Sequence, residues 1–390
     1  YIKSSSYIKL SSHESRKTLK KKFTRGFEYS DCTVDDSRLT VLNAVDASKL
    51  GATIKTRTTV KKIEQKNDIW HIETFDSINN QNVKIRAKVV INATGPWIDS
   101  FLKNSTCQPK TDNVRLVKGS HIIVNKLYDH GYSYIFQNGD GRVIFAIPYE
   151  NNYTLIGTTD IDFAGEPNNA RPTISEIDYL CNSAGIYFKK NITADQVIKQ
   201  FSGVRPLYDN GETKAQNITR DYVLKVESKK SKSALINIFG GKLTTYRRLS
   251  EKIMDNIESI LERKKPAWTH NTPLPGGESM QIGHDNLINT LTTEHNYLET
   301  DHINRLSKSY GTRAFEILKE VTSISDLGEH FGSNLYQKEV DYLMKEEFAL
   351  YPEDILERRT KLGLCLEVDK IDNLEKYMQK KRQVINQCQK

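Results

Sequence analysis

The first 265 residues carry short apolar runs, separated by polar turns, in a pattern that predicts β-strands. Runs at 53–60, 69–75 and 83–91 predict a small antiparallel meander that returns into a buried strand at 89–91. Residues 1–25 are polar and basic without periodicity, which predicts a loop. Further strands are predicted at 114–124, 132–137, 142–148, 153–159, 200–207 and 218–226, with Asn138-Gly139-Asp140-Gly141 as a hairpin turn.

Helical spacing follows capping residues at two places. Asp36-Ser37 predicts the start of a helix that runs to Gly51, and Thr173-Ile174-Ser175-Glu176 is a capping box that opens a helix to about Phe188. The stretch 235–247 combines both patterns, because an apolar run ends in Gly240-Gly241 and helical spacing follows. Such a strand–turn–helix suits an anion or the edge of a flat ring, since free N–H groups face it. An ordinary turn explains the same stretch equally well.

The pattern changes after residue 265. Residues 266–283 are rich in Pro, Gly and Thr, which predicts a linker, and residues 284–390 show helical spacing almost throughout. At 390 residues the chain is long for one domain. We therefore expect an α/β domain over 1–265, incomplete at its N-terminus, a linker over 266–283, and an all-α domain over 284–390.

Composition narrows the class of protein. The net charge of +8 favours anionic partners, although a lysine-rich surface explains most of it, and the basic residues lack the aromatic interleaving of nucleic-acid modules. Five scattered cysteines predict a reducing compartment without a disulfide framework. No apolar run approaches the roughly 18 residues of a membrane span, and no signal-peptide pattern is present. The chain starts at Tyr1, which suggests a fragment.

Three groups of residues could carry chemistry. Arg205, Arg220 and Lys242 each lie on or just after a predicted strand, so together they could hold a phosphate dianion; unrelated surface cations are the alternative. His121, in the strand 114–124, is either a base for a hydroxyl proton or a structural histidine. The small residues at 93–95, after the strand at 89–91, let the backbone lie against a cofactor, or form a plain turn. There is no Gly-x-Gly-x-x-Gly in the chain.

Taken together, these motifs resemble the FAD-dependent, respiratory-chain glycerol-3-phosphate dehydrogenases. The resemblance runs from about residue 25 to about residue 365, and several motifs occur in the family's order. The stretches that carry it are Arg25–Cys32, Val34–Leu39, Asn92–Trp97, Arg115–His121, Ile156–Asp160, Ser202–Leu207, Ile218–Tyr222, Phe239–Arg247, Ser325–Gly328 and Arg358–Lys361.

The resemblance implies a glutathione-reductase-like FAD-binding fold of the α/β (α+β) class, with an antiparallel substrate sheet and a C-terminal helical domain. It implies oxidation of sn-glycerol 3-phosphate to dihydroxyacetone phosphate, with hydride passing to FAD and electrons to a membrane quinone. It also implies peripheral contact with the cytoplasmic face of the bacterial inner membrane, or a cytoplasmic location, and allows a homodimer. Nucleic acid and metal ions are not expected partners.

The resemblance also assigns residues. The substrate-pocket positions are His121, Arg205, Arg220 and Lys242, and the flavin contacts are Ala93, Thr94, Gly95, Gly241, Leu243 and Thr244, with Val60 near the adenine. The family's opening strand, dinucleotide fingerprint and helix do not match any stretch of this sequence. The competing hypothesis is therefore a non-catalytic fragment of such an enzyme, which cannot bind FAD without that segment.

Overall fold

The computed structural model describes residues 3–106, 113–209, 221–227, 233–262, 264–278 and 283–388, with side chains to residue 383. They group into two compact units. The first contains Tyr1–Cys32, Thr59–Asp76 and Asn80–Lys265, and the second contains Thr33–Thr58, Ser77–Asn79 and Pro266–Lys390.

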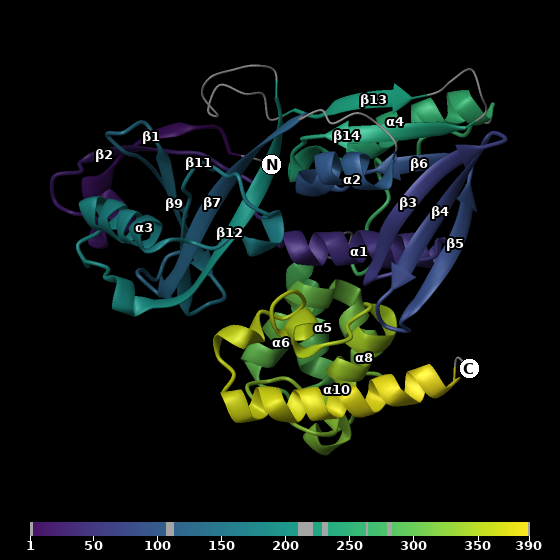
Figure 1. Cartoon of the computed structure of the whole chain (residues 1–390). Helices are drawn as coiled ribbons and strands as arrows, with labels where there is room; N and C mark the ends of the chain where they lie inside the picture. The colour runs from purple at the N-terminus through teal and green to yellow at the C-terminus, as the bar shows by residue number, and fades with distance from the viewer. Residues whose placement is uncertain are drawn as a thin grey trace. The chain divides into compact units, whose positions relative to one another are not determined.

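A six-stranded antiparallel sheet dominates the first unit (Figure 1). Its longest strands are β7 (Val114–Asn125) and β12 (Val197–Tyr208), which pair along nearly their whole length. The helix α3 (Ile174–Tyr187) packs on one face through Leu180 and Ala184, which share a core with Ile122 of β7. The remaining strands are β8 (Tyr134–Gln137), β9 (Val143–Tyr149), β10 (Tyr153–Gly157) and β11 (Ile161–Asp162).

The N-terminal segment is ordered against this sheet, so the prediction of a loop over 1–25 is wrong for much of that range. Strands β1 (Ser6–Lys9) and β2 (Arg25–Glu28) pair antiparallel. Leu10 and Leu19 are buried in the core beneath α3. Sequence periodicity missed the segment because only a few anchoring side chains hold it, rather than a continuous apolar stripe.

The three-stranded meander is confirmed as β3 (Thr58–Lys66), β4 (Ile69–Asp76) and β5 (Gln81–Ala87). The predicted bounds 53–60 of its first strand are wrong, because β3 begins at Thr58 and continues to Lys66. The run 83–91 breaks at residue 88, because β6 (Val89–Asn92) leaves the meander and pairs in parallel with β14 (Ala234–Phe239). β13 (Val223–Glu227) lies on the other side of β14. β14 is buried along its length, whereas Ile91 is 44% exposed, so the expected burial of the strand at 89–91 is wrong.

The second unit is helical, as predicted for 284–390, and it also contains α1 (Asp36–Lys49). The Arg38 guanidinium of α1 makes a buried two-pronged ion pair with Glu347, one prong measuring 2.9 Å, and Lys361 Nζ lies 3.2 Å from Asp35. The Lys361–Asp35 pair joins two of the stretches that carry the resemblance, Val34–Leu39 and Arg358–Lys361. The other helices are α5 (His284–Glu294), α6 (Thr300–Tyr310), α7 (Ala314–Ile317), α8 (Gln337–Glu346), α9 (Pro352–Leu356) and α10 (Val368–Cys388).

Candidate active site

The turns that follow β6 and β14 lie at the same end of this parallel strand pair in the first unit. Because β6 and β14 run parallel with Asn92 opposite Asn237, the chain continues from both strands on one side. Asn92 Nδ2 donates to Asn237 Oδ1 at 2.9 Å, and Thr94 Oγ1 donates to Asn92 Oδ1 at 2.7 Å. This buried amide pair therefore fixes the start of the turn at 93–95.

Glycines make the main chain of these turns accessible. Gly95, Gly240 and Gly241 have φ angles of +55°, +69° and +107°, which L side chains rarely adopt. A Cβ added to Gly95 would meet nothing within 4 Å, and Leu243 and Thr244 are exposed. The open backbone at Gly95 and the exposed residues Leu243 and Thr244 fit the approach of a flat ring, as the flavin assignment requires.

His121 lies on β7 between two close neighbours. Gly157 of β10 is its partner on one side and Phe201 of β12 on the other. The imidazole stacks on the Phe201 ring with centroids 5.1 Å apart and planes 9° from parallel. A Cβ on Gly157 would lie 2.6 Å from Nε2, so only glycine leaves room for the ring.

Burial and a neighbouring cation keep His121 neutral. Burial is the largest cause that lowers the pKa of His121, the charge of Arg205 adds to it, Asp160 opposes it, and the result is a pKa of about 4. The imidazole is therefore uncharged near neutral pH and can accept a proton. Its buried Nδ1 has no hydrogen-bond partner among the residues that the structure describes.

Arg205 extends over the same face of β7. A Cβ on Gly119 would lie 3.3 Å from Arg205 Nη2, and Gly119 and His121, two residues apart on a strand, point to one side. Arg205 Nη1 forms an ion pair with Asp160, and 35% of the Arg205 side chain is exposed. The structure therefore brings the neutral His121 and the charged Arg205 together, with the Asp160 carboxylate between strands β10 and β11 as the partner of Arg205.

Lys242 follows the glycine turn after β14. Its Nζ lies 3.2 Å from Asp221 Oδ1, and about half of the side chain is exposed. The turn abuts β12, because a Cβ on Gly240 would lie 3.4 Å from the carbonyl oxygen of Pro206, the residue after Arg205. Lys242 is thus on an element that touches β12.

The structure does not bring two of the assigned residues, Arg220 and Val60, together with His121, Arg205 and Lys242. Arg220 lies outside the described residues. Val60, on β3, packs against a cluster that includes Ile98 and Leu235, so its contact with an adenine stays a prediction. Asp160 and Asp221 were not singled out from the sequence, although both stand in stretches that carry the resemblance, directly beside strands.

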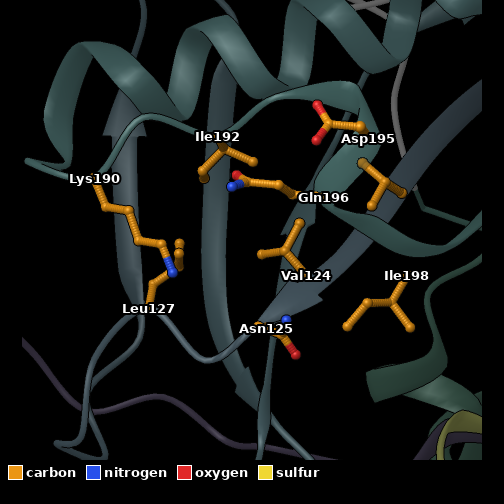
Figure 2. A pocket seen from close by; sticks show the side chains of 9 residues that line it. Val124, Asn125, Leu127, Lys190, Ile192, Asp195, Gln196 and Ile198 are labelled. Atoms are coloured by element: carbon orange, nitrogen blue, oxygen red, sulfur yellow. The ribbon is translucent and has the colours of Figure 1, made fainter.

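A separate cavity of about 310 Å³ opens at the far end of β7 (Figure 2). None of the assigned residues lines it. Its lining consists of Val124, Asn125, Leu127, Lys190, Ile192, Asp195, Gln196, Val197 and Ile198. The described part of the chain also contains no group of three or more His, Cys, Asp or Glu residues placed to hold a metal ion.

Comparison with known proteins gives the family. Residues 6–247 match the family of FAD dependent oxidoreductases, and residues 267–382 match the C-terminal domain of alpha-glycerophosphate oxidase. A glycerol-3-phosphate dehydrogenase of Pseudomonas aeruginosa is 42% identical over 361 residues, which cover 93% of this chain and 70% of that protein. This chain belongs to the FAD-dependent glycerol-3-phosphate dehydrogenase family. The resemblance noted from the sequence is therefore confirmed, and FAD is the cofactor of the family.

Two further relatives bear on fold and substrate. The glycerol-3-phosphate dehydrogenase of Bacillus halodurans, solved with FAD, superposes with a TM-score of 0.74 at 24% identity and covers 98% of this chain and 79% of that one. This likeness confirms the FAD-dependent oxidoreductase fold with its C-terminal helical domain. A D-erythritol 1-phosphate dehydrogenase of Brucella abortus is 41% identical over 344 residues, 88% of this chain and 68% of that protein.

The described residues fit the ring end of FAD. The turns at 93–95 and 240–244 offer exposed main chain at the shared edge of β6 and β14. The glycine-rich fingerprint that binds a pyrophosphate is not in the sequence of this family member. In the part of the chain that is described, no helix is both long and apolar enough to span a membrane.

Proposed function

We propose that this dehydrogenase-family chain oxidises sn-glycerol 3-phosphate to dihydroxyacetone phosphate. The observation that supports this most is a neutral, half-buried His121 beside Arg205, on a sheet that adjoins the two flavin-type turns. Bound FAD would accept the hydride from C2. The chain's own residues then have two tasks, which are to take the hydroxyl proton and to hold the phosphate.

His121 has the first task. Loss of hydride from C2 makes the hydroxyl acidic, so a neutral base within hydrogen-bond reach lowers the barrier. An imidazole that stays uncharged down to about pH 4 is in the accepting form at every physiological pH. The stack on Phe201 and the gap left by Gly157 fix the plane of the ring.

Arg205 and Lys242, together with Arg220, have the second task. Arg205 and Lys242 are each paired with a carboxylate, Asp160 and Asp221 respectively. A phosphate dianion carries more charge than one carboxylate and presents a matching fork of oxygens to a guanidinium. The substrate would therefore compete for cations that are already extended and held in place.

Transfer of electrons to a membrane quinone belongs to the same proposal, as does peripheral contact with the cytoplasmic face of a bacterial inner membrane. The family resemblance supports both, together with a possible dimer. The absence of a spanning helix among the described residues is compatible with peripheral contact.

A four-carbon phosphorylated polyol is the second candidate substrate. The identity to the D-erythritol 1-phosphate dehydrogenase, 41%, is nearly that to the glycerol-3-phosphate dehydrogenase, 42%. Both substrates carry a phosphate and at least one secondary hydroxyl, so the same clamp and base serve either.

The experiment compares the two substrates on the chain supplied with an N-terminal strand–turn–helix that carries Gly-x-Gly-x-x-Gly, so that FAD is retained. Bleaching of the flavin absorbance without oxygen should be fastest with sn-glycerol 3-phosphate and slow in His121→Ala. Faster bleaching by D-erythritol 1-phosphate would move the assignment to the longer polyol. If neither substrate bleaches the flavin, the proposed activity is wrong.

A further inference from the structure

A buried carboxylate lies on the opposite face of β7 from His121. Glu176, in the first turn of α3, is only 3% exposed, and Lys118 of β7 is 6% exposed. Lys118 Nζ donates to Glu176 Oε2 at 2.7 Å and to the carbonyl oxygen of Arg171 at 3.0 Å. Burial works against the charge on Glu176, but hydrogen bonds from Lys118, Ser120 and Thr173 outweigh it and lower the pKa of Glu176 to about 2.

The same carboxylate also holds two hydroxyls. Ser120 Oγ donates to Glu176 Oε1 at 2.7 Å, and Thr159 Oγ1 donates to the same oxygen at 2.9 Å. Ser120 N in turn donates to Thr159 Oγ1 at 2.9 Å. The carboxylate therefore joins β7 to the segment between β10 and β11.

Each of these hydroxyl residues precedes a residue of the candidate site. Ser120 precedes His121, and Thr159 precedes Asp160, the ion-pair partner of Arg205. Because successive side chains of a strand point to opposite faces, Ser120 reaches Glu176 while His121 faces Arg205. One carboxylate thus ties together the backbone positions of the proposed base and of the phosphate clamp.

A capping box alone does not need this arrangement. Thr173 N and Oγ1 already occupy Glu176 Oε2 at 2.9 Å each, which completes the helix cap. A buried ion pair is a poor source of stability, since well-packed apolar residues often replace one without loss. What the carboxylate adds is a fixed spacing between two strand segments.

From this geometry we propose that Glu176 is a positioning residue, which acts through Ser120 and Thr159 to hold His121 and the Asp160–Arg205 pair in register. The inference deepens the proposed function. Its test uses the protonation of His121 as a local reporter, and this reporter needs neither FAD nor substrate.

The experiment is an NMR titration of the full chain with labelled histidine, in which Ile91→Lys at the exposed strand β6 limits self-association. The His121 signal is identified by its loss in His121→Gln. In the wild type, His121 should titrate at about pH 4. Thr159→Val removes the hydroxyl but keeps a side chain of similar size. It should let Asp160 and its partner Arg205 move away from His121, and so raise the midpoint of the His121 titration by about one pH unit or more towards 6.5. Thr159→Ser keeps the hydroxyl and should restore the wild-type midpoint.

A matched control separates an effect on the position of His121 from a general loss of protein stability. Glu339→Gln disrupts an equally buried ion pair, with Arg305 at 2.6 Å, but in the helical unit. It should lower the melting temperature and leave the His121 titration unchanged. If folded Thr159→Val titrates as the wild type does, the proposal is wrong. If Thr159→Val does not fold, the His121 titration is measured in Ser120→Ala instead, and an unchanged midpoint there contradicts the proposal.

The substrate arm distinguishes this proposal from the proposed function. If the titration shifts but the loaded wild-type enzyme does not oxidise sn-glycerol 3-phosphate, the activity is wrong and the positioning stands. If the enzyme is active but the titration of folded Thr159→Val is unchanged, Glu176 has no positioning role.

Discussion

Gly157 stands directly opposite His121 in the antiparallel pairing of β10 and β7, and the imidazole fills the space that a side chain at Gly157 would take. The position is therefore closed to every residue with a Cβ unless the ring moves. The position of the His121 ring therefore depends on the missing side chain at Gly157 as well as on the histidine itself.

Gly157→Ala should displace the His121 ring. Its Cβ would lie 2.6 Å from Nε2 and closer still to Cδ2, so the strand or the ring must shift, at a cost of about 1–3 kcal/mol in unfolding free energy. Urea denaturation measures the cost, and flavin reduction by substrate measures the loss of the base. Gly139→Ala is the control, since a Cβ there would meet nothing within 4 Å. Equal behaviour of the two variants would contradict the packing described.

Arg205→Ala should weaken the productive binding of the phosphorylated substrate. Because bound substrate buries the guanidinium, loss of this charge-assisted pair should cost about 2–5 kcal/mol of binding free energy. This cost should appear as a lower kcat/KM, mostly through a higher KM. Steady-state kinetics measure this on the chain supplied with the same N-terminal strand–turn–helix, which lets it retain FAD. Arg142→Ala removes a comparably exposed ion pair, with Asp140 at 2.7 Å, outside the site. Unchanged kinetics in Arg205→Ala would remove Arg205 from the pocket.

His121→Ala should lower kcat by roughly 10²–10⁴-fold, because the substrate hydroxyl loses its proton acceptor. In the wild type, kcat/KM corrected for ionisation of the substrate phosphate, which has a pKa of about 6, should have an acid limb at about pH 4, since protonation of His121 blocks acceptance. Arg205→Ala should move that limb upward, because the Arg205 charge lowers the pKa of His121. Full turnover in His121→Ala would assign the base to another group.

Sequence patterns found the elements whose signals are local. The turn at 240–241, the capping box at 173–176 and the meander follow from residues a few positions apart. The Arg205–Asp160 pair requires the register of β12 and the segment after β10, which no periodicity encodes. The pairing of Arg38 with Glu347, 309 positions apart, is likewise invisible locally, so a helix predicted within the first domain groups with the helical unit.

Only part of the candidate site was predicted from the sequence. His121 and Arg205 stand in motifs and were named before their contacts were known. Glu176 was recognised only as a helix cap, because its contacts with Ser120 and Thr159 form only when β7 and the segment between β10 and β11 fold against α3. Long-range polar networks of this kind are specified by packing and register rather than by spacing.

The helical unit should lose stability as the pH falls from about 6.5 to about 4, partly through His302. Burial is the main cause, and Arg305 a second, that lowers the pKa of His302 to about 4, while Glu339 opposes them. The unfolded chain therefore binds a proton that the folded chain excludes, and the full stability is present only above about pH 6.5. The slope should approach about 1.4 kcal/mol per pH unit.

Urea denaturation at about pH 7 and about pH 5 measures this effect. His302→Gln should flatten the dependence, while His270→Gln, at an exposed position, should leave it as in the wild type. A dependence that survives His302→Gln in full would assign the proton uptake to other groups.

The edge of β6 bears on whether a polypeptide of these 390 residues retains FAD. Among the described residues β6 pairs with β14 on one side only, and Ile91 is 44% exposed. A parallel strand edge with exposed apolar side chains is a template for another strand. The sequence also has no glycine-rich turn for the pyrophosphate, although the ring turns are present. We therefore expect this polypeptide to purify without stoichiometric FAD and without dehydrogenase activity, and to self-associate.

Absorbance spectra, protein-bound flavin content and light scattering of the purified polypeptide test this expectation together. Ile91→Lys places a charge on the open edge, so it should reduce self-association without restoring flavin. Adding the polypeptide to a separately expressed strand–turn–helix that carries Gly-x-Gly-x-x-Gly should raise flavin retention in the wild type more than in Ile91→Lys. A yellow, monodisperse preparation of the 390 residues alone, with about one flavin per chain, would show that the ring turns suffice to hold the cofactor.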